Sequence, residues 1–167
     1  MYENYILIFM LLCYLIPVII VYYNYDCNSA ISNIICNNNC KSKVLFFMIL
    51  MGIGTLVYEI KRNDIYAIIF ILFLLFGLYG LICINEMYII HYVFAILVFI
   101  CIILFMLRHC YLTKCNDILL ISLILELFVL IFILKNIRKN IFSAQVFYIL
   151  NFAFFYLYLH YISFIKL

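Results

Sequence analysis

The stretch that decides the fold is residues 65–108, which read IYAIIFILFLLFGLYGLIC (65–83), INEMYII (84–90) and HYVFAILVFICIILFMLR (91–108). A transmembrane helix needs about 20 mostly apolar residues, and both long runs come close to that length. They are joined by a short turn that contains Asn85 and Glu86. The stretch therefore predicts a helical hairpin in a membrane.

The whole chain has the composition of a membrane protein. Of its 167 residues, 72% are hydrophobic and 10% are charged, whereas soluble domains are about 45–50% apolar and about 25% charged. The formal net charge of +3 is spread over turns and forms no basic patch, so we exclude nucleic acid as a partner. The abundant Ile, Phe, Tyr and Asn have AT-rich codons. We therefore attribute the many aromatic residues to an AT-rich genome and not to a binding site.

We predict an all-α, polytopic transmembrane helical bundle, in which residues 1–167 form a single domain of about six spans with short connections. The expected spans are residues 5–23, 44–58, 65–83, 88–107, 118–134 and 141–164. The charged residues from Glu59 to Asp64 are expected to form a solvated turn, and those from Arg108 to Asp117 form the next turn. The ten basic residues divide five and five between the two sides, so the positive-inside rule gives no orientation.

Small residues within the spans predict close helix packing. Gly52 and Gly54 lie in the second expected span, and Gly77 and Gly80 lie in the third. Glycine lets two helices approach closely in lipid. We expect these four positions to be helix contacts.

The longest polar stretch, residues 24–43, reads NYDCNSAISNIICNNNCKSK and has the composition of an exposed loop. It contains Cys27, Cys36 and Cys40. An oxidising compartment would favour a disulfide among them, with one cysteine left over. Zinc is the other alternative, but these cysteines lack a well-spaced fourth ligand. We therefore expect neither a metal nor a cofactor.

Four polar residues at membrane depth are the ligand or polar-core candidates. Glu126 lies in the middle of an apolar span, where a charge costs about 2.5–3.5 kcal/mol, so it should face the bundle. Asn151 lies at a similar depth in the last span and is its expected partner. His91 and Gln145 enter their spans from the same side and could also meet. The functional interpretation is a polar pocket for a lipid headgroup or a proton-carrying carboxyl; the alternative is hydrogen bonding between helices.

The chain contains no Gly-x-Ser-x-Gly, His-Glu-x-x-His, Walker or TVGYG motif. We therefore assign no catalytic residues. An enzyme would need two of the polar candidates within hydrogen-bond reach of one substrate atom.

Short motifs between residues 54 and 95 carry a family resemblance. They are Gly54-Thr55 followed by Tyr58 and Lys61, then Gly77-Leu78-Tyr79-Gly80, then His91 with Ala95. This order resembles the middle of the DRAM/Frag/Sfk family of six-pass membrane proteins, in which a Gly-Leu-x-Gly helix precedes a turn and a His-x-x-x-Ala helix. The chain departs from the family at residues 92–94, where the family often has Asp and then Gly.

The resemblance implies a protein of an endomembrane or the plasma membrane that acts on lipid organisation, lipid-anchor maturation or autophagy, without catalysis of its own. It also implies a cytoplasmic N-terminus. Membrane lipids would be its partners. Two alternatives stay open: a structural subunit of a larger assembly, such as a virion membrane or a respiratory-type complex, and an intramembrane lipid enzyme. A cavity lined by some of the four polar candidates would favour the lipid-modulating protein.

Overall fold

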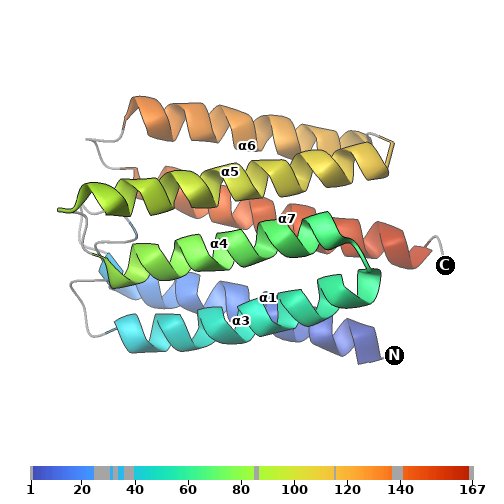
Figure 1. Cartoon of the computed structure of the whole chain (residues 1–167), viewed down its shortest axis with the longest axis horizontal. Coiled ribbons are helices and arrows are strands. Elements are labelled where there is room, and N and C mark those ends of the chain that lie inside the picture. The colour runs from blue at the N-terminus through green and yellow to red at the C-terminus, as the bar shows by residue number, and fades with distance from the viewer. Residues whose placement is uncertain are drawn as a thin grey trace.

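The computed structural model describes residues 2–24, 31, 34–35, 40–84, 87–114, 116–136 and 141–165, and within these ranges the chain is helical with no strand. The long helices lie side by side, and successive helices run in opposite directions (Figure 1). Their bounds are Tyr2–Tyr23 (α1), Lys41–Arg62 (α3), Ile65–Cys83 (α4), Ile89–Leu112 (α5), Asp117–Lys135 (α6) and Phe142–Ile165 (α7). The prediction of an all-α bundle is confirmed for the described residues.

Five of these helices are long and apolar enough to cross a membrane. They are α3, α4, α5, α6 and the Phe142–Ile162 part of α7. The α1 helix contributes a shorter apolar segment, Leu7–Tyr23. Length and composition therefore support five candidate spans, and a sixth span through α1 stays a prediction.

The α3 and α5 helices run further at their C-terminal ends than the sequence predicts. The α3 helix covers residues 41–62, where the prediction was 44–58. It ends because Asn63 takes a left-handed conformation, with φ 57°, and its N–H bonds the carbonyl of Ile60 at 3.1 Å. The α5 helix likewise continues to Leu112, so that Arg108 is helical. In both places a charged last turn of helix was mistaken for a connection, because its composition is that of a turn.

The four glycines lie where neighbouring helices touch. A Cβ at Gly52 or at Gly77 would come within 2.8 Å of a side chain on the next helix, and a Cβ at Gly80 would overlap the Phe94 ring. The α4 and α5 helices therefore meet most closely around Gly77 and Gly80. Gly54 faces Met10 of α1 in the same way.

The polar stretch 24–43 is only partly the exposed loop that was expected. Ile34 and Ile35 are buried against the ends of α1 and α3, and α3 already begins at Lys41. Cys40 is a buried free thiol whose Sγ lies 3.7 Å from the carbonyl oxygen of Ile34. Cys40 is therefore the cysteine that such a disulfide would leave over, and a bond between Cys27 and Cys36 stays a prediction because both lie outside the described residues.

Candidate functional site

A cavity of about 350 Å³ lies among the helices, in the half of the bundle that carries the α4–α5 and α6–α7 connections (Figure 1). All six described helices contribute to its wall; examples are Tyr14, Met48, Leu78, Phe99, Leu134 and Phe152. Ligand pockets in proteins usually measure about 300–1,000 Å³. The cavity is therefore large enough for a small molecule or for part of a lipid.

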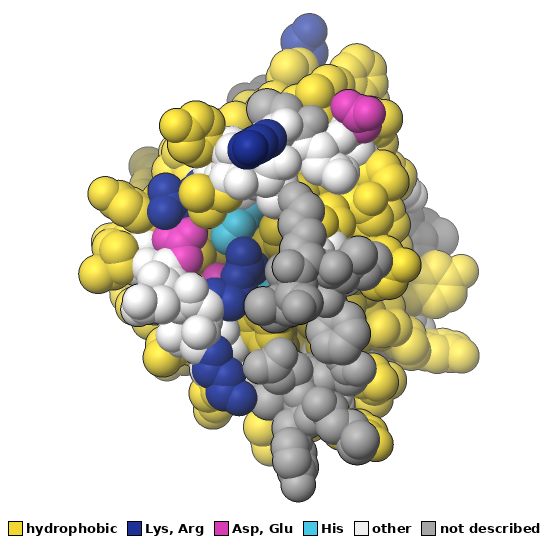
Figure 2. Space-filling view, turned by 90° about the vertical axis from the view of Figure 1, so that its right-hand side faces the viewer, with side chains coloured by type: hydrophobic (Ala, Val, Ile, Leu, Met, Phe, Trp, Pro, Cys, Tyr) yellow, Lys and Arg dark blue, Asp and Glu magenta, His cyan; other side chains and the backbone are white. Residues whose placement is uncertain are grey.

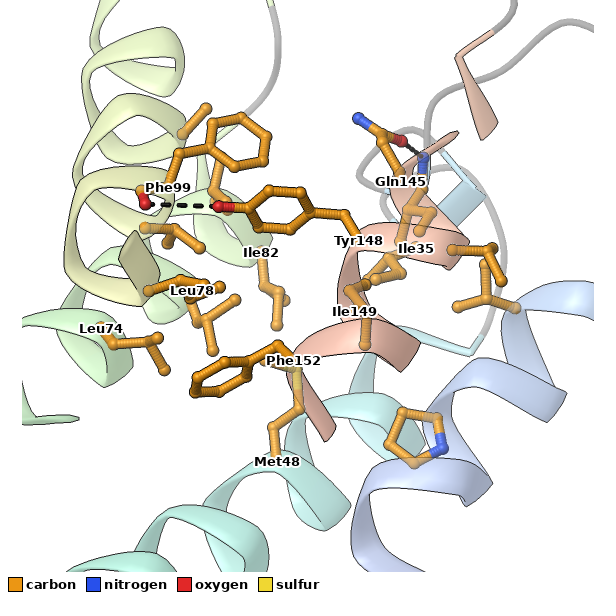
Figure 3. A pocket seen from close by; sticks show the side chains of 18 of the residues that line it. Ile35, Met48, Leu74, Leu78, Ile82, Phe99, Gln145, Tyr148, Ile149 and Phe152 are labelled. Atoms are coloured by element: carbon orange, nitrogen blue, oxygen red, sulfur yellow. Dashed lines mark hydrogen bonds between the residues drawn. The ribbon is translucent and has the colours of Figure 1, made fainter. Parts of the chain in front are cut away.

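The wall of the cavity is mostly apolar and carries no formal charge. Figure 3 shows apolar side chains of α3, α4 and α7 converging on one space, among them Met48, Leu74, Leu78, Ile149 and Phe152. No Asp, Glu, Lys or Arg among the described residues lines it. Because an unpaired buried charge is costly, this wall suits an apolar occupant.

His91 and Gln145, which the sequence places on the same side of the bundle, both line this cavity. His91 Nδ1 lies 2.8 Å from the carbonyl oxygen of Ile84. The backbone N–H of Ile31 donates to Gln145 Oε1 at 2.9 Å (Figure 3). The two side chains therefore share a cavity, but each is held by a backbone group.

Tyr148 is a lining residue that the sequence reasoning missed. Its hydroxyl donates to the carbonyl oxygen of Phe99 at 3.4 Å (Figure 3), and its ring meets the Phe99 ring edge-on at 5.0 Å between centroids. It lies three residues after Gln145, and residues three apart share one helix face. That spacing was the signal available in the sequence.

Glu126 and Asn151 meet between α6 and α7, as the depth of the two residues predicts. Asn151 Nδ2 donates to Glu126 Oε2 and, at 2.9 Å, to the carbonyl oxygen of Ser122. The Ser122 hydroxyl donates to Asn151 Oδ1, also at 2.9 Å. Glu126 is fully buried, and its Oε1 has no hydrogen-bond partner among the described residues. These contacts form a polar helix contact outside the cavity, since neither Glu126 nor Asn151 lines it.

A second buried polar cluster lies at the opposite end of the bundle, near both chain termini (Figure 1). Figure 2 shows basic, acidic and histidine side chains gathered on this end. The Tyr156 hydroxyl donates to Glu59 Oε1 at 3.0 Å, and Arg62 Nη1 lies 3.7 Å from the same oxygen. Arg62 Nη2 lies 3.5 Å from His109 Nδ1. Side chains of α3, α5 and α7 are thereby joined.

The burial of this cluster overturns two expectations. Glu59 and His109 were expected in solvated turns, but both are fully buried. Since an arginine can only donate, His109 Nδ1 accepts and Nε2 carries the ring proton; that Nε2 is buried without a partner among the described residues. The Glu59–Arg62 spacing of three residues, which fits one helix face, was the only sequence signal.

Asp64 holds the start of α4 to the end of α5. Its Oδ1 accepts from the backbone N–H groups of Tyr66 and Ala67, at 3.1 and 3.3 Å, and thus caps α4. Arg108 Nε lies 3.0 Å from both carboxylate oxygens, and its guanidinium lies 4.4 Å from the Tyr66 ring centroid. Burial acts to raise the pKa of Asp64, but the hydrogen bonds from Arg108 and Ala67 and the Arg108 charge outweigh it, so the pKa lies below its ordinary value of 3.8.

Among the described residues, no three His, Cys, Asp or Glu side chains are grouped so that they could hold a metal ion. The candidate binding site is the cavity, whose two polar tethers are the side chains of His91 and Gln145. No protein-family model, curated protein or solved structure matches the chain.

Proposed function

We propose that this chain is an integral membrane protein that binds a lipid in the cavity and thereby modulates membrane lipid organisation, without catalysing a reaction itself. The observation that carries the proposal is the cavity of about 350 Å³ inside a bundle with five candidate spans. The α1 helix would be the sixth span. An endomembrane or the plasma membrane is the proposed location, because the resemblance to the DRAM/Frag/Sfk family implies it.

The geometry supports binding better than catalysis. General acid–base catalysis needs side chains within hydrogen-bond reach of one substrate atom. Here one polar atom of His91 and one of Gln145 are held by backbone groups, no carboxyl among the described residues lines the cavity, and Glu126 lies outside it. A wall of this kind can hold and orient an apolar ligand, with hydrogen-bonding groups that fix one end.

The test is a cavity-filling substitution with a matched control on the same helix. Ala95 lines the cavity, whereas Val93, two residues away, is 56% exposed and does not. Wild type, Ala95→Phe and Val93→Phe would be purified in a mild detergent and analysed by native mass spectrometry for bound lipid. We expect a defined lipid on the wild type and on Val93→Phe, and its loss from Ala95→Phe.

Equal lipid on all three proteins would contradict the proposal, because binding would then not depend on the cavity. Stoichiometric protein partners with no defined lipid would instead favour the structural subunit. Circular dichroism of each variant checks that the helices are intact.

A further inference from the structure

We propose that the ligand is an uncharged lipid with one apolar chain and a hydroxyl-bearing head, and that it reaches the cavity sideways from the bilayer, between α5 and α6. This inference rests on the proposed function. It adds the chemical class of the ligand and its route. Neither follows from the existence of a cavity alone.

The uncharged head follows from the residues of the wall. All titratable lining residues are of types that are neutral near pH 7: tyrosine, cysteine and histidine. A phosphate or an ammonium inside this wall would be a buried charge without a counter-charge, which is strongly unfavourable. Lys43 and Lys135 adjoin the lining residues Val44 and Leu134 at this end of the bundle, but no Lys or Arg among the described residues lines the cavity itself.

The hydroxyl follows from the hydrogen bonds of the two tethers. Because a carbonyl only accepts, His91 Nδ1 donates to Ile84, which leaves Nε2 as the ring nitrogen that can accept a hydrogen bond. Because a backbone N–H only donates, Gln145 presents Oε1 to Ile31, and its amide NH₂ is left as a donor. One acceptor and one donor at the same end of a cavity complement a hydroxyl group, which both donates and accepts.

The single chain follows from size. A protein cavity of about 150 Å³ holds a benzene molecule, and this cavity of about 350 Å³ is little more than twice as large. Along α5 it reaches from His91 to Ile102, which is a length of roughly 16 Å at 1.5 Å per residue. This space accommodates one apolar chain, and the two chains of a phospholipid do not fit.

The sideways route follows from lining residues whose side chains are also exposed on the outer surface of the bundle. Tyr92 and Ile96 on α5 are 47% and 51% exposed, and Leu134 at the end of α6 is 49% exposed, yet all three also line the cavity. The cavity therefore reaches the outer surface of the bundle between these two helices. Both are candidate spans, so the opening faces lipid.

The experiment compares three photoactivatable probes on the wild-type protein in nanodiscs: a long-chain alcohol, the alkyl phosphate of the same chain, and a two-chain phosphatidylcholine. Labelled peptides are mapped by mass spectrometry. We expect the alcohol to label cavity peptides of α5 and α7 at least about tenfold more than the phosphate. Burying one polar group without a partner weakens binding by about that factor. Equal or stronger labelling by the phosphate or the phospholipid overturns the proposed class and leaves the proposed function standing. No cavity labelling by any probe removes the proposed function as well.

Two pairs of variants test the details. Gln145→Glu keeps an acceptor for the Ile31 N–H and removes the donor, so labelling by the alcohol should fall about tenfold; unchanged labelling overturns the hydroxyl assignment. For the route, Ile96→Trp is compared with Ile100→Trp, since Ile100 is 49% exposed one turn further on and does not line the cavity. Slower labelling in Ile96→Trp alone is expected, and equal rates overturn the sideways route.

Discussion

Replacing Asn151 with leucine tests how strongly the polar contact in the middle of the bundle holds α6 to α7. The change keeps a side chain of similar size and removes three hydrogen bonds, two that Asn151 donates and one that it accepts from Ser122. Such bonds in a membrane contribute about 0.6 kcal/mol each, or about 2 kcal/mol together. The fully buried Glu126 also loses its donor, which adds about 1 kcal/mol or more. We therefore expect a loss of about 3 kcal/mol in the free energy of unfolding.

The assay is reversible unfolding in mixed detergent micelles, followed by circular dichroism as the denaturing detergent is increased. Phe154→Leu is the control, because Phe154 lies on the same helix and is half exposed; its stability should match that of the wild type. Stability of Asn151→Leu within about 0.5 kcal/mol of the wild type would refute the reasoning, since three such bonds cannot contribute so little.

Glu126→Gln separates a structural role from a functional one. Glutamine still offers an oxygen to Asn151, so stability should change by less than about 1 kcal/mol. Lipid binding should also be unchanged, because Glu126 does not line the cavity. Normal stability with lost lipid binding would give Glu126 a functional role.

Three further substitutions probe other contacts with the same unfolding assay. Gly80→Ala should cost about 1–3 kcal/mol, because its Cβ overlaps the Phe94 ring; Phe94→Leu should relieve most of that cost in the double variant. Asp64→Asn keeps the cap and loses the charge, so up to about 1 kcal/mol should be lost at pH 7. Because the pKa of Asp64 is lowered when folded, this difference is present above pH 3.8 and should shrink below it. Tyr156→Phe should cost about 1–3 kcal/mol, because Glu59 loses its hydroxyl donor; unchanged stability would show that the bond contributes nothing.

The architecture could be predicted from the sequence because apolar runs in lipid leave the backbone few alternatives to helix. Helix ends were harder. The end of α3 depends on the left-handed backbone of Asn63, and its last turn contains charged residues that look like a connection. Composition alone does not separate a charged last turn of helix from a loop.

Only some of the buried polar contacts and lining residues could be predicted from the sequence. Equal depth in two spans was enough to predict that Glu126 and Asn151 meet. The burial of Glu59 could not be predicted in that way, because it depends on Tyr156, which is 97 residues away. The cavity was also hidden, since a residue such as Leu78 looks the same in a sequence whether it faces a space or a neighbour.

With the proposed lipid as its occupant, the cavity would tie the stability of this chain in a cell to the composition of the membrane around it. Empty space in a protein interior costs about 24 cal/mol per Å³, so about 350 Å³ left unfilled would cost on the order of 8 kcal/mol. Folded proteins are stable by only about 5–15 kcal/mol in total. A bilayer that cannot supply an occupant would therefore leave much more of the chain unfolded and open to proteolysis. The steady-state abundance of the protein would then report how much of that lipid the membrane holds.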